Sequence, residues 1–190
     1  MTVQVNRALF LDRDGVINHD SGYTSCADEF KFIDGIFDLC RAANLSGYLL
    51  IVVTNQAGIG RGYYSEHDFL RLTEWMCDRF QAEGAPINDV FYCPFHPEHA
   101  VGQYKKDSFD RKPNPGMIIR AAKTHGLDLA RSIMIGDKDS DMRAAKSAGV
   151  GIRCQYLHDF QTTEMCISAT HKIESLRDGI ELLYRVGNNS

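Results

Sequence analysis

The sequence predicts an α/β fold in which a central parallel sheet is covered by helices on both faces, giving a three-layer sandwich. Two observations lead to this prediction. Short runs of consecutive apolar residues, such as 8–11 and 48–53, are typical of strands that are buried on both faces. Between them lie longer segments in which apolar residues recur every three or four positions, as in amphipathic helices. Strands that alternate with helices in this way favour parallel pairing.

Length and composition predict a single domain. The chain has 190 residues, of which 44% are apolar and 24% are charged, enough for one compact domain and marginal for two. It shows no internal repeat, low-complexity segment or linker, so we expect one domain over residues 1–190. The formal net charge of −4 argues against a dedicated nucleic-acid binder, but it allows a small anionic substrate held by a few local cations.

The first half of the chain is expected to hold two strands and two helices. Ser65 is predicted to cap the second helix, and Asp68, three residues later, completes an approximate capping box. The expected elements are, in order, a strand at 8–11, a helix at 36–45 closed by Gly47, a strand at 48–53, a glycine-rich loop at 57–62 and a helix behind Ser65 that continues to about Phe80.

The second half continues the alternation around one irregular segment. Residues 93–111 are polar and lack a clear period, which is typical of a functional loop. Asn114 and Pro115 are predicted to open the next helix as its cap and first residue, and Asp139 is predicted to cap the helix after that. The other expected elements are strands at 89–92, 132–135, 151–154 and about 169–173, a helix that ends at Gly149 and a last helix at about 176–184.

The lack of a recognisable targeting signal and the spacing of the cysteines predict a cytoplasmic protein. Residues 1–7 are polar and lack the apolar stretch of a signal peptide, and no window approaches the roughly 20 apolar residues that cross a bilayer. The six cysteines are scattered without a C-x-x-C pair, which favours reduced thiols over a disulfide framework. We therefore expect no membrane partner, and nothing in the sequence demands more than a monomer.

Polar side chains follow the predicted strands at the point where each strand ends. Asp12 and Asp14 follow the first strand, Thr54 follows the second, and Asp137 follows the strand at 132–135. Ligands of parallel sheets bind beyond these strand ends, so we expect the side chains to converge on one crevice. Together with Lys112, which precedes a helix, they include a nucleophile, an acid/base and phosphate-binding donors, the parts that phosphoryl transfer requires.

The carboxylates of this predicted crevice also indicate a divalent cation. Asp12, Asp14 and Asp137 would repel one another at close range unless a cation joined them. Mg²⁺ suits such a site because it is hard, prefers oxygen ligands and retains several waters. Thr54 would add a hydroxyl donor and Lys112 a mobile positive charge.

The strand-end residues resemble the four sequence signatures of the haloacid dehalogenase superfamily. A lone D-x-D is weak evidence, whereas four signatures in order, each at a strand end or before a helix, are strong evidence. The signatures are D-x-D-G at 12–15, Thr54, Lys112 and G-D-x-x-x-D at 136–141.

Longer segments resemble one family of this superfamily, the D-glycero-D-manno-heptose 1,7-bisphosphate phosphatases, and the related histidinol-phosphate phosphatases share much of the pattern. The resemblance runs from about residue 9 to residue 150, and the glycines of 58–62 and the Asp-Lys pair at 137–138 favour the heptose group. The segments are FLDRDGVIN at 10–18, VTNQAGIGRG at 53–62, CPFHP at 93–97, RKPNPGM at 111–117 and GDK at 136–138.

This resemblance implies a mechanism and a reaction. Asp12 would attack phosphorus to form an aspartyl-phosphate, and Asp14 would protonate the departing sugar oxygen and then activate water. Mg²⁺ would be held by Asp12, the main-chain carbonyl of Asp14 and Asp137. The implied reaction removes the C7 phosphate of the heptose bisphosphate in the biosynthesis of nucleotide-activated heptose.

The resemblance also implies which residues bind the substrate, which would be a small anionic sugar bisphosphate. Thr54, the main chain of Asn55 and Lys112 would hold the phosphoryl group that is transferred. Asp141 would support Lys112 or the metal site from behind. The rest of the doubly charged sugar would be held by basic residues, namely Arg61, Arg111 and Lys138.

The segment at 93–111 departs from the family pattern. Relatives carry Cys-x-His followed by Cys-x-Cys, a set suited to structural zinc. Here Cys93 is present, but Phe95 replaces the histidine, and Ser108 and Asp110 stand at the cysteine positions. We therefore expect no structural zinc. Other candidate ligands in the segment are His96, His99 and Asp107.

Several alternatives stay open at this point. Asp12 and Asp14 could each be exposed turn residues, and Asp137 a helix cap, although the ordered set favours catalysis. Within the same chemistry, histidinol phosphate or another small sugar phosphate could be the substrate. A noncatalytic binding protein on this fold would be expected to lose Asp12 or Asp14. A mutase or phosphotransferase usually carries a larger cap domain, for which the gap between Gly15 and Asp34 leaves little room.

Overall fold

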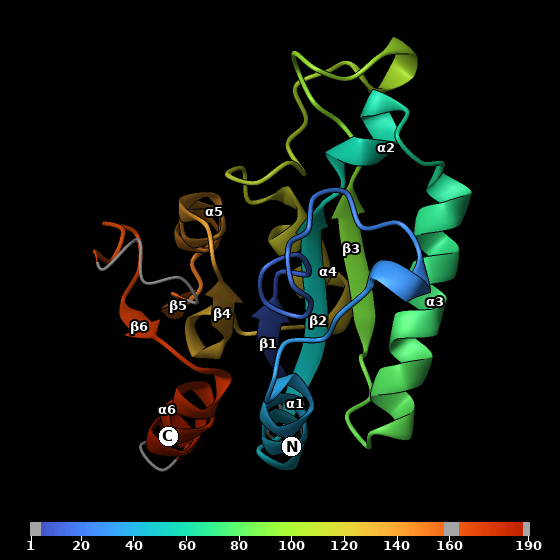
Figure 1. Cartoon of the computed structure of the whole chain (residues 1–190). Coiled ribbons are helices and arrows are strands. Elements are labelled where there is room, and N and C mark those ends of the chain that lie inside the picture. The colour runs from blue at the N-terminus through green and yellow to red at the C-terminus, as the bar shows by residue number, and fades with distance from the viewer. Residues whose placement is uncertain (1–4, 158–163, 188–190) are drawn as a thin grey trace.

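The computed structural model describes residues 5–157 and 164–187, and it confirms the predicted fold class. Within these residues, six strands form one parallel sheet in the order β3-β2-β1-β4-β5-β6 (Figure 1). The strand order therefore reverses between β1 and β4, where parallel sheets form their ligand crevice. The strands are β1 (Arg7–Leu11), β2 (Tyr48–Asn55), β3 (Asp89–Cys93), β4 (Ile133–Gly136), β5 (Ile152–Tyr156) and β6 (His171–Ile173).

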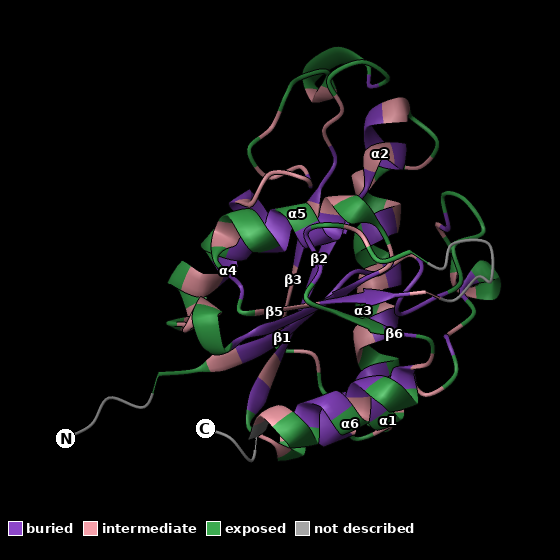
Figure 2. Cartoon of the chain, turned by 90° about the vertical axis from the view of Figure 1, so that its left-hand side faces the viewer, coloured by how far each residue is buried: buried purple, intermediate pink, exposed green. Residues whose placement is uncertain are grey.

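Helices cover both faces of the sheet and complete the three layers. One face is covered by α1, α3 and α6, and the other by α4 and α5, as Figure 2 shows for α1 and α6 below the sheet and α4 and α5 above it. The helices are α1 (Ile36–Leu45), α2 (Ala57–Arg61), α3 (Glu66–Ala82), α4 (Gly116–His125), α5 (Asp139–Ala148) and α6 (Leu176–Gly187), with short 3₁₀ turns at Ala27–Glu29, Gly102–Tyr104 and Leu129–Arg131.

Strand β1 shows why its run of apolar residues is uninterrupted. Leu9 and Leu11 belong to the core between the sheet and α1, α3 and α6, whereas Ala8 and Phe10 belong to the core under α4 and α5. Successive side chains of a strand point to opposite faces, so a strand between two helical layers needs apolar residues at every position. This fixes β1 in the middle of the sheet and places its carboxyl end, followed by Asp12, at the crevice.

The glycine-rich segment 57–62 was expected to be a loop, and this expectation was wrong. The segment forms α2, and Gly62, with a φ of 75°, ends it. The other glycines serve close packing rather than turning. A Cβ at Gly58 would lie 2.4 Å from the Tyr64 ring, and one at Gly60 would lie 2.5 Å from the Pro94 carbonyl oxygen. The sequence pattern does not distinguish a glycine needed for a turn from one needed for close approach.

The start of α4 also differs from the expectation. The helix begins at Gly116 with Pro115 in the cap position, and Asn114 lies outside it. Asn114 Nδ2 donates to the Ser108 carbonyl at 3.0 Å, and the main-chain N–H of Gly116 donates to the Phe109 carbonyl at 2.9 Å. The 93–111 segment thus satisfies the first helical N–H group, which a capping side chain would otherwise do.

Helix α5 begins one residue earlier than the predicted cap implies. Asp139 is its first residue and not its cap, and Lys138 occupies the cap position. The carboxylate that reaches back is that of Asp141, whose Oδ2 accepts from the Lys138 main-chain N–H at 3.0 Å. In the first turn, the charge of Asp139 still interacts favourably with the helix dipole.

The predicted capping box at the start of α3 is confirmed. Ser65 Oγ accepts from the Asp68 main-chain N–H at 3.1 Å, and Asp68 Oδ2 accepts from the Ser65 main-chain N–H at 3.0 Å.

The irregular character of 93–111 is confirmed as well, apart from the 3₁₀ turn Gly102–Tyr104. In the described part of the chain, no helix combines the length and the apolar character needed to cross a membrane.

Candidate active site

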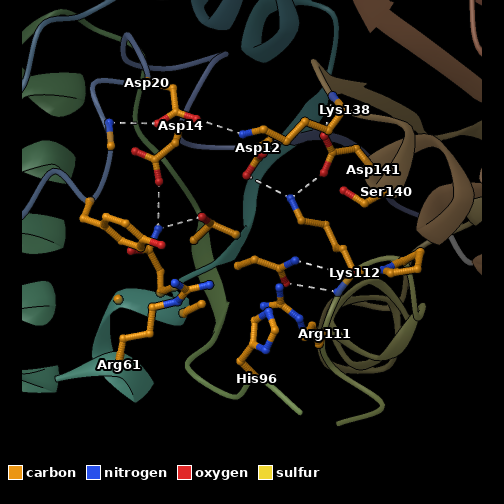
Figure 3. Close-up of a pocket in the computed structure, with 18 of the residues that line it drawn as sticks. Asp12, Asp14, Asp20, Arg61, His96, Arg111, Lys112, Lys138, Ser140 and Asp141 are labelled. Atoms are coloured by element: carbon orange, nitrogen blue, oxygen red, sulfur yellow. Dashed lines mark hydrogen bonds and ion pairs between the residues drawn. The ribbon is translucent and has the colours of Figure 1, made fainter. Parts of the chain in front are cut away.

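A cavity of about 620 Å³ lies at the carboxyl ends of the central strands, where the strand order reverses. In Figure 3, Asp12, Asp14 and Asp141 lie on one side of it and Arg61, His96 and Arg111 on the other, with Lys112 between them. The residues predicted to act on or bind the substrate all line this cavity: Asp12, Asp14, Thr54, Asn55, Arg61, Arg111, Lys112 and Lys138.

Asp12, the predicted nucleophile, is held by its Oδ1 atom. This oxygen accepts from the Arg13 main-chain N–H at 2.7 Å and lies 2.9 Å from Lys112 Nζ. No described residue donates a hydrogen bond to Oδ2, so this oxygen is available for the predicted attack on phosphorus, which stays a prediction. Burial raises the pKa of the Asp12 carboxyl to about 6, although Lys112 opposes this shift.

Lys112 connects three acceptors at the floor of the cavity. Its Nζ lies 2.9 Å from Asp12 Oδ1, 2.6 Å from Asp141 Oδ1 and 2.9 Å from the Val53 carbonyl oxygen. Burial disfavours the charged ammonium group, but the two carboxylates outweigh burial and raise the pKa of Lys112. The expectation that Lys112 carries a mobile charge was therefore wrong, because three contacts hold its buried ammonium group in place. Of the two roles predicted for Asp141, support of Lys112 agrees with the contact between them.

Asn55 ties the Lys112 backbone to strand β2. Asn55 Nδ2 donates to the Lys112 carbonyl, and the Lys112 main-chain N–H donates to Asn55 Oδ1, both at 3.0 Å. This reciprocal pair fixes the start of the Lys112 side chain relative to the strand end. The side chain of Asn55 thus has a structural task, and a role of its main chain in holding phosphate stays a prediction.

The structure brings three carboxylates together at a site suited to a hard cation. One oxygen each of Asp12, Asp137 and Asp141 lies within 4.8 Å of the others. Burial and then the charge of Asp12 raise the pKa of Asp137 to about 7. Gly15 lets Asp137 approach, because a Cβ there would lie 2.2 Å from Asp137 Oδ2. An oxygen-only, negatively charged donor set of this kind fits Mg²⁺.

The three carboxylates are not equally available to a metal ion. Asp141 Oδ1 contacts Lys112 Nζ, and Asp141 Oδ2 accepts from the Lys138 main chain. Asp12 and Asp137 are therefore the better candidates of the three. The carboxylate of Asp14 is not part of the group, so its predicted contribution through the main-chain carbonyl stays a prediction.

Asp14, the predicted acid/base, is held by three side chains. Arg13 Nη2 lies 2.8 Å from Oδ1 and 2.9 Å from Oδ2, Asn18 Nδ2 donates to Oδ1 at 3.0 Å, and Gln56 Nε2 donates to Oδ2 at 3.0 Å. Gln56 also donates to Thr54 Oγ1 at 2.9 Å. Thr54, which is predicted to bind phosphate, and Asp14, which is predicted to be the acid/base, therefore accept from the same amide group.

Sequence reasoning did not single out the three residues that hold Asp14. Gln56 carried a signal, because it lies two positions after Thr54 and side chains at i and i+2 of an extended segment share a side. Arg13 and Asn18 carried none beyond their nearness to Asp14. An arginine between two aspartates usually faces solvent, whereas Arg13 is only 2% exposed and reaches the Thr24 carbonyl.

Two predicted arginines lie at the outer part of the cavity. The Arg61 guanidinium lies 5.6 Å from the centre of the Tyr23 ring, and Arg111 Nη1 donates to the Phe95 carbonyl at 3.2 Å. Burial, together with the nearby Arg61, lowers the pKa of Arg111, although Cys93 opposes the shift. Two neighbouring guanidinium groups with little carboxylate nearby form an attractive environment for an anion.

Lys138 is placed differently from these arginines. Its Nζ lies 3.0 Å from Asp20 Oδ2 and 3.6 Å from Asp137 Oδ2. Burial opposes its charge, but Asp137, Asp12 and Asp20 together raise its pKa. Its positive charge is therefore shared with acidic residues, and one of them, Asp20, lines the same cavity although the sequence did not single it out.

The 93–111 segment borders the cavity and is held by direct contacts. Phe95, at the position where the family pattern has histidine, lies with its ring centre 3.8 Å from Lys106 Nζ. Tyr104 OH donates to Glu66 Oε2 at 3.2 Å, and the His96 main-chain N–H donates to the Tyr104 carbonyl at 3.2 Å. A cation–π contact and hydrogen bonds thus hold the segment in place. The expected lack of structural zinc stays a prediction.

Known proteins resemble this chain over almost its whole length. A family model described as HAD-hydrolase-like matches residues 109–154. The D-glycero-alpha-D-manno-heptose-1,7-bisphosphate 7-phosphatase of Burkholderia mallei is 54% identical over 178 residues, which cover 94% of each chain. The D-glycero-beta-D-manno-heptose-1,7-bisphosphate 7-phosphatase of Vibrio cholerae is 46% identical over 180 residues, which cover 94% of this chain and 97% of the relative.

A solved structure shares the fold. The D,D-heptose 1,7-bisphosphate phosphatase of B. bronchiseptica, complexed with magnesium and phosphate, superimposes with a TM-score of 0.81 and 24% identity, covering 94% of this chain and 98% of that one. The resemblance inferred from the strand-end signatures is confirmed by these matches. The chain belongs to the haloacid dehalogenase superfamily, and within it to the family of the D-glycero-D-manno-heptose-1,7-bisphosphate 7-phosphatases.

Proposed function

We propose that the chain removes the C7 phosphate of D-glycero-D-manno-heptose 1,7-bisphosphate through an aspartyl-phosphate on Asp12. One observation carries the proposal. A buried carboxylate with one oxygen fixed by Lys112 lies in the same cavity as a second carboxylate, Asp14, that three side chains hold in place. This pair supplies a nucleophile and a separate proton carrier, and the relatives named above act on this sugar.

In the first step, an oxygen of Asp12 attacks phosphorus and the bond from phosphorus to the C7 oxygen breaks. Asp14 gives its proton to that oxygen, so that an alcohol leaves rather than an alkoxide. Thr54 lines the cavity with a hydroxyl that can donate to a phosphoryl oxygen, and the positive charge of Lys112 offsets the negative charge of the phosphoryl group. The product is the heptose 1-phosphate, and the phosphoryl group remains on Asp12.

In the second step, water attacks the phosphorus of the aspartyl-phosphate. Asp14, now ionised, takes a proton from this water, and the bond from phosphorus to Asp12 breaks to release orthophosphate. Mg²⁺, held by Asp12 and Asp137, would offset the negative charge of the carboxylates and the phosphate. Asp14 starts and ends the cycle protonated, so the residues are regenerated.

Arg61 and Arg111 would hold the end of the sugar that keeps its C1 phosphate. The buried Nε of Arg61 has no hydrogen-bond partner among the described residues, which leaves one donor for an anion. Lys138 contributes less in this scheme, because Asp20 and Asp137 share its charge. A monophosphate lacks the group that the two arginines would bind, so they favour a bisphosphate.

The α anomer is the expected substrate. The Burkholderia relative, which is named for the α anomer, is 54% identical, and the Vibrio relative, which is named for the β anomer, is 46% identical. The monomeric state and the cytoplasmic location predicted from the sequence remain predictions.

Phosphate release tests the proposal. The enzyme is given each anomer of heptose 1,7-bisphosphate and histidinol phosphate, with Mg²⁺ and with a chelator. ³¹P NMR then shows which phosphate of the heptose remains. We expect Mg²⁺-dependent release at C7, faster with the α anomer. Faster release from histidinol phosphate would replace the proposed substrate, and no release from any phosphomonoester would support a noncatalytic role.

A further inference from the structure

A chain of hydrogen bonds runs from Tyr64, outside the reacting groups, to the acid/base Asp14. Tyr64 OH donates to Gln56 Oε1 at 2.6 Å, and Gln56 Nε2 donates to Asp14 Oδ2 at 3.0 Å. Gln56 is only 2% exposed, so water has little access to these bonds. In Figure 3 the dashed line that runs down from the Asp14 carboxyl group marks the bond from Gln56.

The direction of each bond in this chain is fixed by chemistry. Between the two steps Asp14 is ionised, and an ionised carboxylate can only accept, so in that state the Gln56 amide must turn its NH₂ group toward Asp14. Its oxygen then faces Tyr64, whose hydroxyl must donate. Burial raises the pKa of Tyr64 to about 12, so this hydroxyl keeps its proton at physiological pH. Tyr64 thereby selects the amide orientation that Asp14 needs.

Helix α2 and the turn after it place Tyr64. A Cβ at Gly58 would lie 2.4 Å from Tyr64 Cε1, so the ring occupies space that only a glycine leaves. The Tyr63 main-chain N–H donates to the Gly58 carbonyl at 3.0 Å, which closes the turn just before Tyr64. The glycines of this segment therefore bring a tyrosine against the strand-end residues of β2.

We propose that Tyr64 is a positioning residue for proton transfer by Asp14, acting through Gln56. The inference rests on the proposed function, because it concerns the two steps in which Asp14 gives and takes a proton. Tyr64 does not touch the reacting atoms in this scheme. It limits rotation of Gln56, and Gln56 limits rotation of the Asp14 carboxyl group, so that the proton is directed at the leaving oxygen.

The size of the effect follows from the other partners of Asp14. Arg13 and Asn18 also hold this carboxyl group, so loss of the Tyr64 hydroxyl loosens Asp14 without releasing it. Loss of one buried hydrogen bond in such a network reduces a rate by about fivefold to tenfold. The rate should fall only for substrates whose leaving group must receive a proton from Asp14.

Leaving groups of different basicity separate positioning of Asp14 from general damage. Release of the leaving group is measured in a single turnover with excess enzyme, so that only the first step is observed. A sugar alkoxide needs the proton of Asp14, whereas p-nitrophenolate leaves without it. For Tyr64→Phe we expect about a tenfold slower release from heptose 1,7-bisphosphate and less than about a twofold change with p-nitrophenyl phosphate. Tyr63→Phe, which removes the neighbouring hydroxyl, should change neither.

A second comparison tests whether Tyr64 acts through Asp14. In an Asp14→Asn background, Tyr64→Phe should slow release no further, because the proton carrier is already absent. An equal loss with both substrates, or a further loss in the Asp14→Asn background, would overturn the inference. Either result would leave the proposed function intact, which fails instead if the wild-type enzyme releases no phosphate from the heptose bisphosphate.

Discussion

The floor of the cavity, formed by Asp12, Lys112 and Asp141, differs sharply from its rim, formed by Tyr23, Arg61 and the 93–111 segment. Each floor side chain is less than a tenth exposed, and ion pairs of 2.6 and 2.9 Å join them. At the rim, Tyr23 is 45% exposed with a φ of 56°, in the left-handed region that side chains seldom adopt.

This difference separates chemistry from selection. In the floor, a charge that loses its partner is buried without compensation, so the three residues depend on one another. At the rim, side chains contact rings, main-chain carbonyls and solvent, so one can change without leaving a buried charge. We infer that the floor fixes phosphoryl transfer and the rim selects which phosphate ester enters. The following predictions test this division.

The largest effect is expected for Asp12→Asn. An amide is a poor nucleophile, so turnover should fall by about 10⁴-fold or more. The fold and Mg²⁺-dependent ligand binding should largely persist, because the side chain keeps its shape. Phosphate release measures the turnover, circular dichroism measures the fold, and titration with orthophosphate in the presence of Mg²⁺ measures ligand binding. Retained turnover would exclude Asp12 as the nucleophile and would contradict the inference that the floor carries out phosphoryl transfer.

The next effect concerns stability and compares two lysines. Lys112→Met leaves Asp12 and Asp141 buried without their cation, so we expect the free energy of unfolding to fall by about 3–5 kcal/mol. Lys138→Met is the matched control. Its side chain is 49% exposed, so its ion pairs should contribute less than about 1 kcal/mol. Urea denaturation measures both. Similar losses for the two variants would contradict the distinction between the buried ion pairs of the floor and half-exposed ion pairs elsewhere in the cavity.

Gly60→Ala tests how the rim is attached to the sheet. The new Cβ would lie 2.5 Å from the Pro94 carbonyl oxygen, so α2 and the 93–111 segment must separate. We expect a loss of about 1–3 kcal/mol in unfolding free energy. Gly179→Ala in α6 is the control, because its nearest contact is the end of the Leu39 side chain at 3.2 Å. Denaturation should show a clearly smaller effect there.

The smallest effect is expected for Arg61→Ala. Loss of one contact to the C1 phosphate should raise KM for heptose 1,7-bisphosphate by about tenfold with little change in kcat. For p-nitrophenyl phosphate, which has no second phosphate, KM should stay the same. Arg177→Ala, an exposed arginine on α6, serves as the control. A fall in kcat for both substrates would show that Arg61 takes part in phosphoryl transfer rather than in substrate selection.

The sequence by itself determined the parallel sheet and the polar residues that gather at one end of it. Runs such as 48–53 identify strands because a strand buried on both faces needs apolar residues at each position. The prediction that Asp12, Thr54 and Asp137 lie close together rested on their places at strand ends, because parallel strands end at one edge of a sheet. Periodicity is a local property, so it can be predicted without coordinates, whereas the order of the strands within the sheet came from the structure.

Only the tertiary structure decided which polar groups pair. Lys112 contacts the Val53 carbonyl 59 residues away, and Gln56 contacts Asp14 42 residues away. Neither contact has a local pattern, because each depends on how two strand ends and a helix start are brought together. The same holds for Gly58, whose lack of a side chain is explained only by the Tyr64 ring packed against it.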